Sequence, residues 1–198
     1  MYIPKHFEQN DKQKSIAFMQ TYNFAIVVSV KNEIPIATHL PFVIEERNDK
    51  IILLSHLSKA NEQHTTFSDT DVLVIFSEPH AYISPTLYEK QQNVPTWNYI
   101  SVHAYGKVKI LDSDEGKLHV LHKQMQFFEA SYIEQFKTLD QKYIDGLLKG
   151  IVAFEIEVSD LQSKAKLNQN KSEKDRQTVK QHLLESDDTV KQDVGKMM

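Results

Sequence analysis

A nearly continuous run of apolar, largely β-branched residues, Phe24 to Val30, most restricts what this chain can fold into. Such a run is typical of a strand that is buried on both faces. Similar patterns follow, with turns indicated at Asn32-Glu33 and Asn48-Asp49. Because most of the strands come early and close together, the sequence predicts a mostly antiparallel sheet. The predicted strands are 24–30, 36–44, 51–55, 71–76, 98–111 and 151–158.

Helical patterns lie before, between and after these strands. Asp112 to Glu115 resembles a helix N-terminus, because a capping side chain is followed by an acid three residues on. Gly150 is a natural stop for the helix that precedes it. Pro79, Pro85 and Pro95 mark an irregular loop that cannot be central sheet. The predicted helices are 13–22, 61–67, 141–148 and 172–184, together with a helix that starts within 112–115 and continues to 128.

These elements predict an α+β, mainly β fold, in which a small and largely antiparallel barrel carries peripheral helices. The length of 198 residues fits one domain. We expect a single domain over residues 1–184, followed by a polar, frayed C-terminal tail over residues 185–198.

Composition excludes several classes of site. The chain has no cysteine, which excludes disulfides, thiolate nucleophiles and sulfur-ligated metals. Its five glycines form neither GxGxxG nor GxxxxGK[ST], which excludes Rossmann and Walker-type phosphate loops. No apolar run approaches the ~20 residues of a membrane helix, and the N-terminus lacks a signal-peptide core. We therefore expect a cytoplasmic protein without a membrane segment.

Charge argues against direct DNA binding. The net charge is −4, and only Arg47 and Arg176 among the 23 basic residues are arginines. A dedicated nucleic-acid binder needs a basic face rich in arginine and lysine. The one basic cluster, within 164–180, is interrupted by acids, and no helix-turn-helix is evident around it. Direct DNA binding is therefore doubtful.

Two patterns suggest metal or hydrolytic chemistry but are incomplete. Glu115, His119 and His122 have helical spacing and could offer three metal ligands. A solvated helix face explains them better, because neither HExxH nor a fourth ligand accompanies them. Ser55, His56 and Asp71 could be joined into a hydrolase triad, but the GxSxG elbow is absent. We expect no metal site and assign no catalytic residue.

The segment Ser55 to Asn61 offers the donors that a phosphate monoester needs. It leaves a predicted buried strand and presents hydroxyls, the Lys59 ammonium and an amide before a predicted short helix. A plain strand-to-helix loop with a capping residue is the alternative interpretation of the same spacing.

Two later segments could line a site for a planar ring. Val94 to Tyr99 carries the only tryptophan, Trp97. Trp97 and Tyr99 could stack on a ring while Asn98 binds its polar edge, or they could anchor the loop on the core. Lys164 to Lys171 is a polar run whose amines and amides could line a site or form a solvated linker.

Five blocks in order carry a resemblance to a known family: Ala37–Pro41, His56–Asn61, Pro79–Pro85, Val94–Tyr99 and Val102–Gly106. In these blocks the chain strongly resembles the PaiB-type family of FMN-binding negative transcriptional regulators. That family is related to split-barrel flavoproteins such as pyridoxamine-phosphate oxidases and small flavin reductases. Met1–Phe7 and Lys166–Asn170 also look like family blocks, so the resemblance covers residues 1–184.

The resemblance implies an FMN-binding split β-barrel that forms a homodimer with FMN at the subunit interface and binds NAD(P)H only transiently. It implies that Thr38 to Leu40 lie along the isoalloxazine edge and that Ser55 to Asn61 hold the ribityl chain and phosphate. Trp97 to Tyr99 would face the flavin pocket, and Lys166 to Asn170 would reach the cofactor or substrate region. The implied cofactor-binding residues are Thr38, His39, Leu40, Ser55, His56, Ser58, Lys59, Asn61, Trp97, Asn98, Tyr99, Lys166, Gln169 and Asn170.

The chain departs from the family pattern at several positions. Lys59 stands alone where split-barrel oxidases carry arginines on the phosphate loop, so a bidentate clamp is absent. Lys171 replaces an arginine that commonly follows the Gln-Asn pair, Asn168 replaces a common serine, and Lys123 replaces an acid. These departures imply a weaker hold on phosphate.

The resemblance leaves three functions open. The first is a flavin-dependent oxidoreductase, either a flavin reductase or a small oxidase, in which the flavin carries the hydride chemistry. His39 and Lys166 are both candidates for stabilising the reduced ring at its N1–C2=O edge. The second is a negative transcriptional regulator that acts indirectly or by DNA binding, and the third is a non-catalytic flavin- or haem-binding protein.

Overall fold

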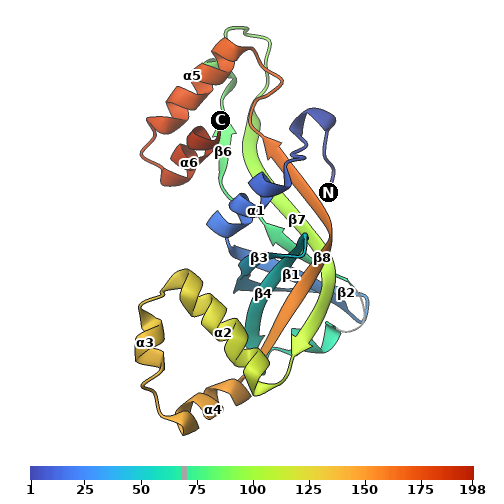
Figure 1. Cartoon of the computed structure of the whole chain (residues 1–198). Helices are drawn as coiled ribbons and strands as arrows, with labels where there is room; N and C mark the ends of the chain where they lie inside the picture. Colours follow the sequence, from blue (N-terminus) through green and yellow to red (C-terminus); the bar gives the residue numbers. More distant parts are fainter. Residues whose placement is uncertain (68–70) are drawn as a thin grey trace. The chain divides into compact units, whose positions relative to one another are not determined.

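The computed structural model describes residues 1–67 and 71–198 as a sheet with flanking helices (Figure 1). The sheet has the strand order β2-β1-β5-β7-β8-β4-β3, and β6 pairs with β7 beside this path. Its strands are β1 Phe24–Lys31, β2 Ile34–Pro41, β3 Val43–Arg47, β4 Lys50–Ser58, β5 Val72–Phe76, β6 His80–Ile83, β7 Thr96–Leu111 and β8 Ile151–Lys166. The α-helices are α1 Lys12–Thr21, α2 Asp114–Phe128, α3 Tyr132–Phe136, α4 Gln141–Lys149, α5 Glu173–Leu184 and α6 Thr189–Met197. Short 3-10 helices are η1 Lys5–Phe7, η2 Glu62–Thr66 and η3 Pro85–Leu87.

Two tight turns set the register of the antiparallel hairpins β1–β2 and β3–β4. Asn32 and Glu33 have φ angles of 51° and 65°, and Asn48 and Asp49 have φ angles of 50° and 64°. Two successive residues with positive φ form the hairpin turn whose twist matches that of the strands, and asparagine tolerates this conformation. The turns predicted at both positions are confirmed.

The described chain forms two compact units. Unit 1 comprises residues 1–15, 77–102 and 162–198, and unit 2 comprises residues 16–76 and 103–161. Strands β7 and β8 contribute residues to both units. The prediction of one domain over residues 1–184 stays a prediction.

Unit 2 is centred on four phenylalanine rings, each at most 1% exposed: Phe42, Phe67, Phe76 and Phe154. Their ring centroids lie 5.0–6.3 Å apart in edge or tilted contacts, which aromatic pairs prefer. Gly106 on β7 is required there, because a Cβ would lie 2.2 Å from the Glu157 carbonyl oxygen of β8. The core of unit 2 is therefore built from packed aromatic rings, and β7 and β8 approach each other closely at Gly106.

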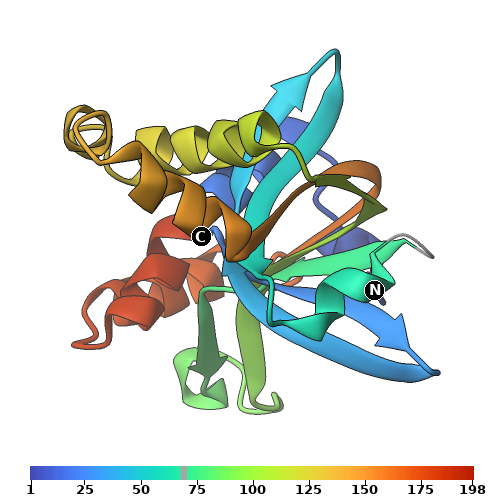
Figure 2. The same ribbon diagram turned by 90° about the horizontal axis from the view of Figure 1, so that it is seen from below.

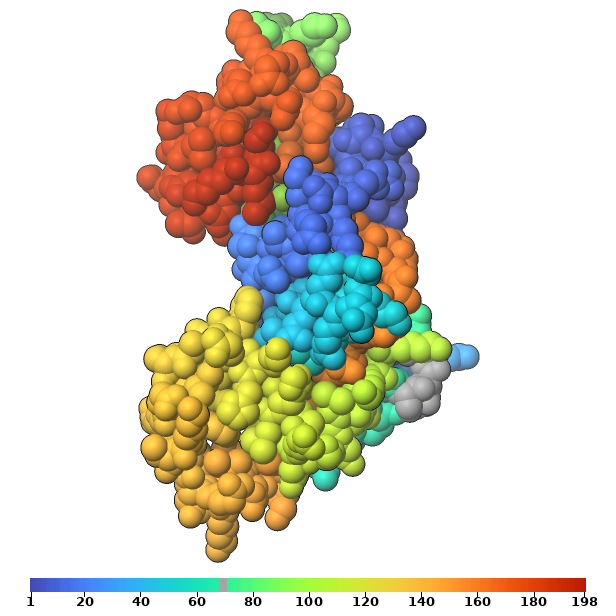
Figure 3. Space-filling view, viewed as in Figure 1, coloured from blue at the N-terminus to red at the C-terminus, as the bar shows by residue number. Residues whose placement is uncertain are grey.

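Helices α2, α3 and α4 form a group within unit 2. Val120 of α2 is fully buried against Leu54 and Ala153 of the sheet. Ile144 and Leu148 of α4 pack in the cluster that joins α4 to α2 and α3. Figure 2 shows α2 and α4 side by side, and Figure 3 shows the group as a continuous yellow-to-orange surface next to the cyan β3–β4 hairpin.

Unit 1 has its own core around the β6–β7 hairpin. Ile83 of β6, Val179 and Leu183 of α5 and Val194 of α6 are all fully buried there. Figure 1 shows α5 and α6 in red beside β6. The N-terminal segment joins this unit through the Glu8–Lys164 bridge and the Gln9 N–H, which donates to the Ser163 carbonyl at 3.0 Å.

The strands and helices confirm the predicted α+β, mainly β class, but several boundaries were wrong. The strand predicted over 36–44 is two strands, β2 and β3, separated at Phe42. The proline-marked loop contains strand β6, which prolines permit because β6 pairs only with β7. The strand predicted over 151–158 continues to Lys166, and α3 was not predicted.

The prediction of a frayed tail from residue 185 is wrong, because residues 189–197 form α6. The Asp188 side chain caps this helix by accepting a hydrogen bond from the Val190 N–H at 2.9 Å. Val194 is fully buried against α5. Tertiary packing therefore stabilises a helix that is too short and polar to be evident from its own sequence.

In the part of the chain that the structure describes, no helix combines the length and the apolar character needed to span a bilayer.

Candidate functional site

Each unit contains one group of the side chains that the sequence singles out. In unit 2, Thr38 of β2 meets the loop of residues 58–61 that follows β4. In unit 1, Trp97 and Tyr99 at the start of β7 lie on one face with residues of β6, close to the end of β8. We call the first the phosphate-loop group and the second the aromatic–lysine group.

Asn61 holds the phosphate-loop group in place. Its Oδ1 caps η2 by accepting from the Gln63 N–H at 3.0 Å, and its Nδ2 donates to Thr38 Oγ1 at 2.9 Å. The Lys59 N–H donates to the Gly150 carbonyl at 2.8 Å. Both ends of the loop are therefore tied to the body of unit 2.

The remaining donors of this group are unused within the described residues. Ser58 Oγ accepts from the Ala60 N–H at 3.3 Å, and Thr38 Oγ1 accepts from Asn61, so each hydroxyl keeps its own proton to donate. The Lys59 ammonium is exposed and has no ion-pair partner among the residues described. The Ser58 hydroxyl and the Lys59 cation on the tethered loop, together with the Thr38 hydroxyl on β2, match the needs of a phosphate monoester.

A buried glutamine in η2, the short helix that follows this loop, bonds to strand β1. Gln63 is 3% exposed. Its Nε2 lies 3.1 Å from the Val27 carbonyl and 3.0 Å from Ser29 Oγ, both on β1. Thr66 also donates to Ser29 Oγ at 2.8 Å. This network joins η2 to the β1–β2 hairpin and so fixes where Asn61 meets Thr38.

Four of the predicted cofactor-binding side chains lie away from the loop's donors. Ser55 is fully buried, and its hydroxyl donates to the Pro41 carbonyl at 2.7 Å. Leu40 is buried in the core. His39 is exposed on β2 with its ring stacked 6.2 Å from that of Phe24. His56 is half-buried, and its Nδ1 lies 2.7 Å from Gln124 Oε1 of α2.

His56 predicts a pH dependence of stability. Burial lowers its pKa below the ordinary value of about 6.5, although the Gln124 hydrogen bond acts in the opposite direction. The unfolded chain therefore binds the proton more readily, so this stability is present above pH ~6.5 and is lost as the pH falls towards the folded pKa. Between pH 7.5 and 5.5 we expect Tm to fall by about 2 °C more in the wild type than in His56→Gln. Equal slopes in the two thermal unfolding series would contradict this assignment.

The aromatic–lysine group begins with the outer face of the β6–β7 hairpin. The cross-strand pairs His80–Tyr99 and Tyr82–Trp97 place four rings on one face. The Trp97 ring lies 5.4 Å from that of His80 and 6.1 Å from that of Tyr82. Trp97 and Tyr82 are each 50% exposed, so this face offers a stacking surface to a planar ring.

Lysines from the end of β8 approach these rings. Lys164 Nζ lies 5.1 Å from the Tyr99 ring centroid and donates to the Tyr2 carbonyl at 3.2 Å. Lys166 Nζ bonds Thr96 Oγ1 and lies 5.9 Å from the Phe7 ring. Burial lowers the pKa of Lys166, and the charge of Lys164 acts in the same direction.

The other predicted residues of unit 1 have local partners. Asn98 is fully buried, its Nδ2 lies 3.6 Å from Met198 Sδ, and its Oδ1 has no partner in the described residues. Gln169 braces the turn after β8 through the Leu167 N–H and the Ala165 carbonyl. Asn170 is exposed. Asn168 has a φ of 60°, a conformation that asparagine tolerates better than the serine common in the family.

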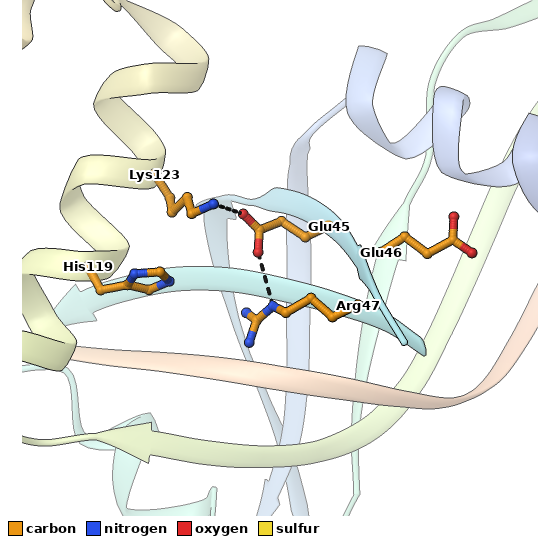
Figure 4. Close-up of a pocket in the computed structure, with 5 residues that line it drawn as sticks. All are labelled: Glu45, Glu46, Arg47, His119 and Lys123. Carbon is orange, nitrogen blue, oxygen red and sulfur yellow. Dashed lines mark hydrogen bonds and ion pairs between the residues drawn. The ribbon is translucent and has the colours of Figure 1, made fainter. Parts of the chain in front are cut away.

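The histidines predicted as an alternative metal site lie in other surroundings. His119 lines a cavity of about 500 Å³ with Lys123 of α2 and Glu45, Glu46 and Arg47 of β3 (Figure 4). The His122 ring packs 5.5 Å from that of Phe136. No cluster of three or more His, Asp or Glu side chains placed to hold a metal ion is found among residues 1–67 and 71–198.

The charges in this cavity compensate one another. Glu45 lies 2.7 Å from Lys123 Nζ and 3.1 Å from Arg47 Nε, while Glu46 points away from them (Figure 4). Burial raises the pKa of Glu45, but the hydrogen bonds and charges of Lys123 and Arg47 outweigh it and lower the pKa below its ordinary value. Arg47 also pairs with Glu155 at 3.0 Å. The charged side chains that line this cavity therefore form an ion-pair network, and this network joins α2 to the sheet.

Sequence reasoning missed three parts of these groups. His80 and Tyr82 were assigned to an irregular loop, although the alternation His80-Ala81-Tyr82-Ile83 is a strand signal that the flanking prolines obscured. Lys164 was assigned to a polar run after a strand, whereas it lies within β8 and is 8% exposed. Gln63 offered no signal, because nothing in a single sequence indicates a buried glutamine.

Residues 1–160 match the family model described as "Putative FMN-binding domain". Over 201 aligned positions the chain is 37% identical to "Protease synthase and sporulation protein PAI 2" of Bacillus subtilis. That alignment covers 100% of this chain and 96% of the relative.

Solved structures share the fold at low sequence identity. The flavocytochrome Anf3 from Azotobacter vinelandii matches with a TM-score of 0.68 and 15% identity, over 88% of this chain and 77% of that one. The FAD and heme binding protein from Mycobacterium smegmatis matches with a TM-score of 0.62 and 14% identity, over 80% of this chain and 73% of that one. These matches confirm the predicted split-barrel fold class.

Proposed function

The chain belongs to the family of that FMN-binding domain model, and on this premise we propose that it is an FMN-dependent oxidoreductase, a flavin reductase or small oxidase, that acts as a homodimer. The observation that carries the proposal is the phosphate-loop group, where Asn61 joins the loop to the Thr38 hydroxyl, and the loop carries the Ser58 hydroxyl and the exposed Lys59, whose ammonium has no ion-pair partner among the described residues. FMN differs from riboflavin by the phosphate that such a group would bind.

The residues present fit FMN in the chemistry of their donors. Ser58, Lys59 and Thr38 would bind the phosphate, and Asn61 would keep them in place. The loop has one cation and no arginine, so its hold on phosphate is a point-charge contact rather than a bidentate clamp. The side chains of Ser55 and His56 already have internal hydrogen-bond partners, so they would not bind FMN directly. They would instead hold β4 in place, the strand from which the phosphate-binding loop continues.

The aromatic–lysine group of unit 1 is the proposed site for the ring of a substrate. Bound FMN supplies hydride transfer, and the protein orients the reactants and tunes the charge around them. Trp97 and Tyr99 would cover a planar ring and exclude water from it. In unit 1, Lys166 would place a positive charge near that ring; in unit 2, exposed His39 is a separate candidate for stabilising the reduced flavin.

The homodimer is supported by the outward face of β1 and β5. On β1 the side chains that alternate inward, such as Val27, are fully buried, whereas Phe24 and Val30 on the outward side are 66% and 51% exposed. An apolar face on a twofold axis is complementary to itself. We define the outward apolar face by its residues Phe24, Ile26, Val28, Val30, Leu73 and Ile75.

Titration of the purified chain with FMN tests the proposal. We expect saturable quenching of flavin fluorescence, a dimeric mass in solution, and NAD(P)H oxidation that depends on flavin. Absence of saturable FMN binding would overturn the proposal. Salt-sensitive retardation of a DNA fragment without flavin turnover would favour the regulator instead, and tight FMN binding without turnover would favour a flavin-binding protein.

A further inference from the structure

We propose that Lys164 and Lys166 form a site for the anionic group, carboxylate or phosphate, of an aromatic substrate whose ring lies on Trp97 and Tyr99. The inference deepens the proposed function and rests on it for the role of substrate. It names the substrate class: aromatic anions, as opposed to neutral or cationic rings.

The first step is the charge of the two lysines. Lys164 is 8% exposed, and within the described residues neither Lys164 nor Lys166 has a carboxylate in ion-pair range. Lys117, the other buried lysine of the described chain, has Asp112 at 3.9 Å. A buried ammonium without a counter-charge raises the free energy of the folded protein. An anion bound at the two lysines would lower that free energy.

The second step is what already contacts these ammonium groups. Lys164 donates to the Tyr2 carbonyl and lies over the Tyr2 and Tyr99 rings, at 5.8 and 5.1 Å. Lys166 bonds Thr96 Oγ1 and lies near Phe7. These neutral partners use part of the three donors of each ammonium, and Glu8, the β-bridge partner of Lys164, forms no ion pair with it among the described residues.

The third step is the ring surface beside the charges. Tyr99 contacts Lys164, and Trp97 lies two residues along β7 on the same side of the strand, next to His80 and Tyr82. Residues i and i+2 of a strand share a face. A ligand with an anionic group joined to one aromatic ring would therefore meet the lysines and the exposed Trp97 ring together.

The fourth step separates this site from the phosphate-loop group. The two lysines belong to unit 1, whereas Ser58, Lys59 and Asn61 belong to unit 2. Their contacts involve different residues, so a variant of one group leaves the contacts of the other unchanged. This permits substrate and cofactor binding to be measured independently.

The test uses Trp97, the only tryptophan, as the reporter. Benzoate, phenyl phosphate and benzamide are titrated into the full chain, with and without FMN, while tryptophan emission is recorded. We expect saturable quenching by both anions, with benzamide at least about tenfold weaker. The better of the two anions identifies carboxylate or phosphate as the preferred group.

Lys164→Met and, as a second variant, Lys166→Met should each weaken binding of the better anion by about tenfold, with FMN affinity changed less than about threefold. Lys171→Met is the matched control, since Lys171 also lies on a tyrosine ring, 4.4 Å from Tyr88, but has Asn93 as a partner at 2.6 Å. NMR of the lysine ε-carbons should show the pKa of Lys166 rising when the anion binds.

Three results would overturn the inference: equal affinity for benzamide, loss of FMN affinity parallel to that of the anion, or no saturable quenching in a chain that still binds FMN. In the second case the lysines would serve the cofactor. Because FMN binding is measured in the same samples, failure of the proposed function itself is a separate outcome.

Discussion

Lys59→Glu is expected to weaken FMN binding by about 100-fold while leaving riboflavin binding nearly unchanged. The substitution replaces the ammonium of the phosphate-loop group by a carboxylate, which repels the phosphate of FMN and has no such effect on riboflavin. The backbone tie from the Lys59 N–H to the Gly150 carbonyl does not involve the side chain. Flavin fluorescence titrations at one stated salt concentration give both dissociation constants.

Lys142→Glu is the matched control for this prediction, because Lys142 is an exposed lysine on α4, outside the phosphate-loop group. Its FMN affinity should stay within about twofold of the wild type, apart from the weak long-range effect of net charge. If Lys59→Glu weakened FMN and riboflavin equally, the loop would act through folding. If it weakened neither, the phosphate would bind elsewhere.

Local signals in the sequence were sufficient for most elements. The turns at Asn32 and Asn48 depend on positive φ angles that neighbouring residues determine, and α4 ends at Gly150, which keeps a φ of −85°. Strand β6 and helix α6 depend on tertiary partners, β7 and α5, that a single sequence does not display. These are the elements that sequence reasoning placed wrongly.

The candidate site was predictable only where its residues are close in sequence. Ser58, Lys59 and Asn61 lie within four consecutive residues, and their donors could be recognised from spacing. The bond from Asn61 to Thr38 and the contact of Lys164 with Tyr99 join residues far apart in the chain. Spacing also could not show that Ser55 turns inward on β4, both faces of which are largely buried, or that Asn98 turns inward on β7.

Strand β1 connects the sequence to the proposed dimer. Its near-continuous apolar run predicts burial on both faces, yet in the described chain only the inward face is fully buried. Ile26 pairs with Ile75 and Val28 with Leu73, so the outward apolar face extends from β1 to β5. Burial of this face by a second copy would account for the sequence pattern.

Val28→Lys is therefore expected to convert the proposed dimer to a monomer, raising its dissociation constant by about 1,000-fold. Val28 lies in the middle of the outward apolar face, and a twofold interface would bury two of the introduced ammonium groups without counter-charges. Light scattering should then report the chain mass of 23.0 kDa in place of twice that mass. Leu147→Lys on α4, where the side chain is also exposed but outside this face, should remain dimeric.

The same pair of variants tests where the cofactor lies. If FMN lies at the subunit interface, Val28→Lys should lose FMN affinity together with the dimer, and higher protein concentration should restore both. A monomer with full FMN affinity would separate the cofactor site from the interface. A dimer that persists in Val28→Lys would show that copies associate through another surface, and the apolar outward side of β1 would then need a different partner.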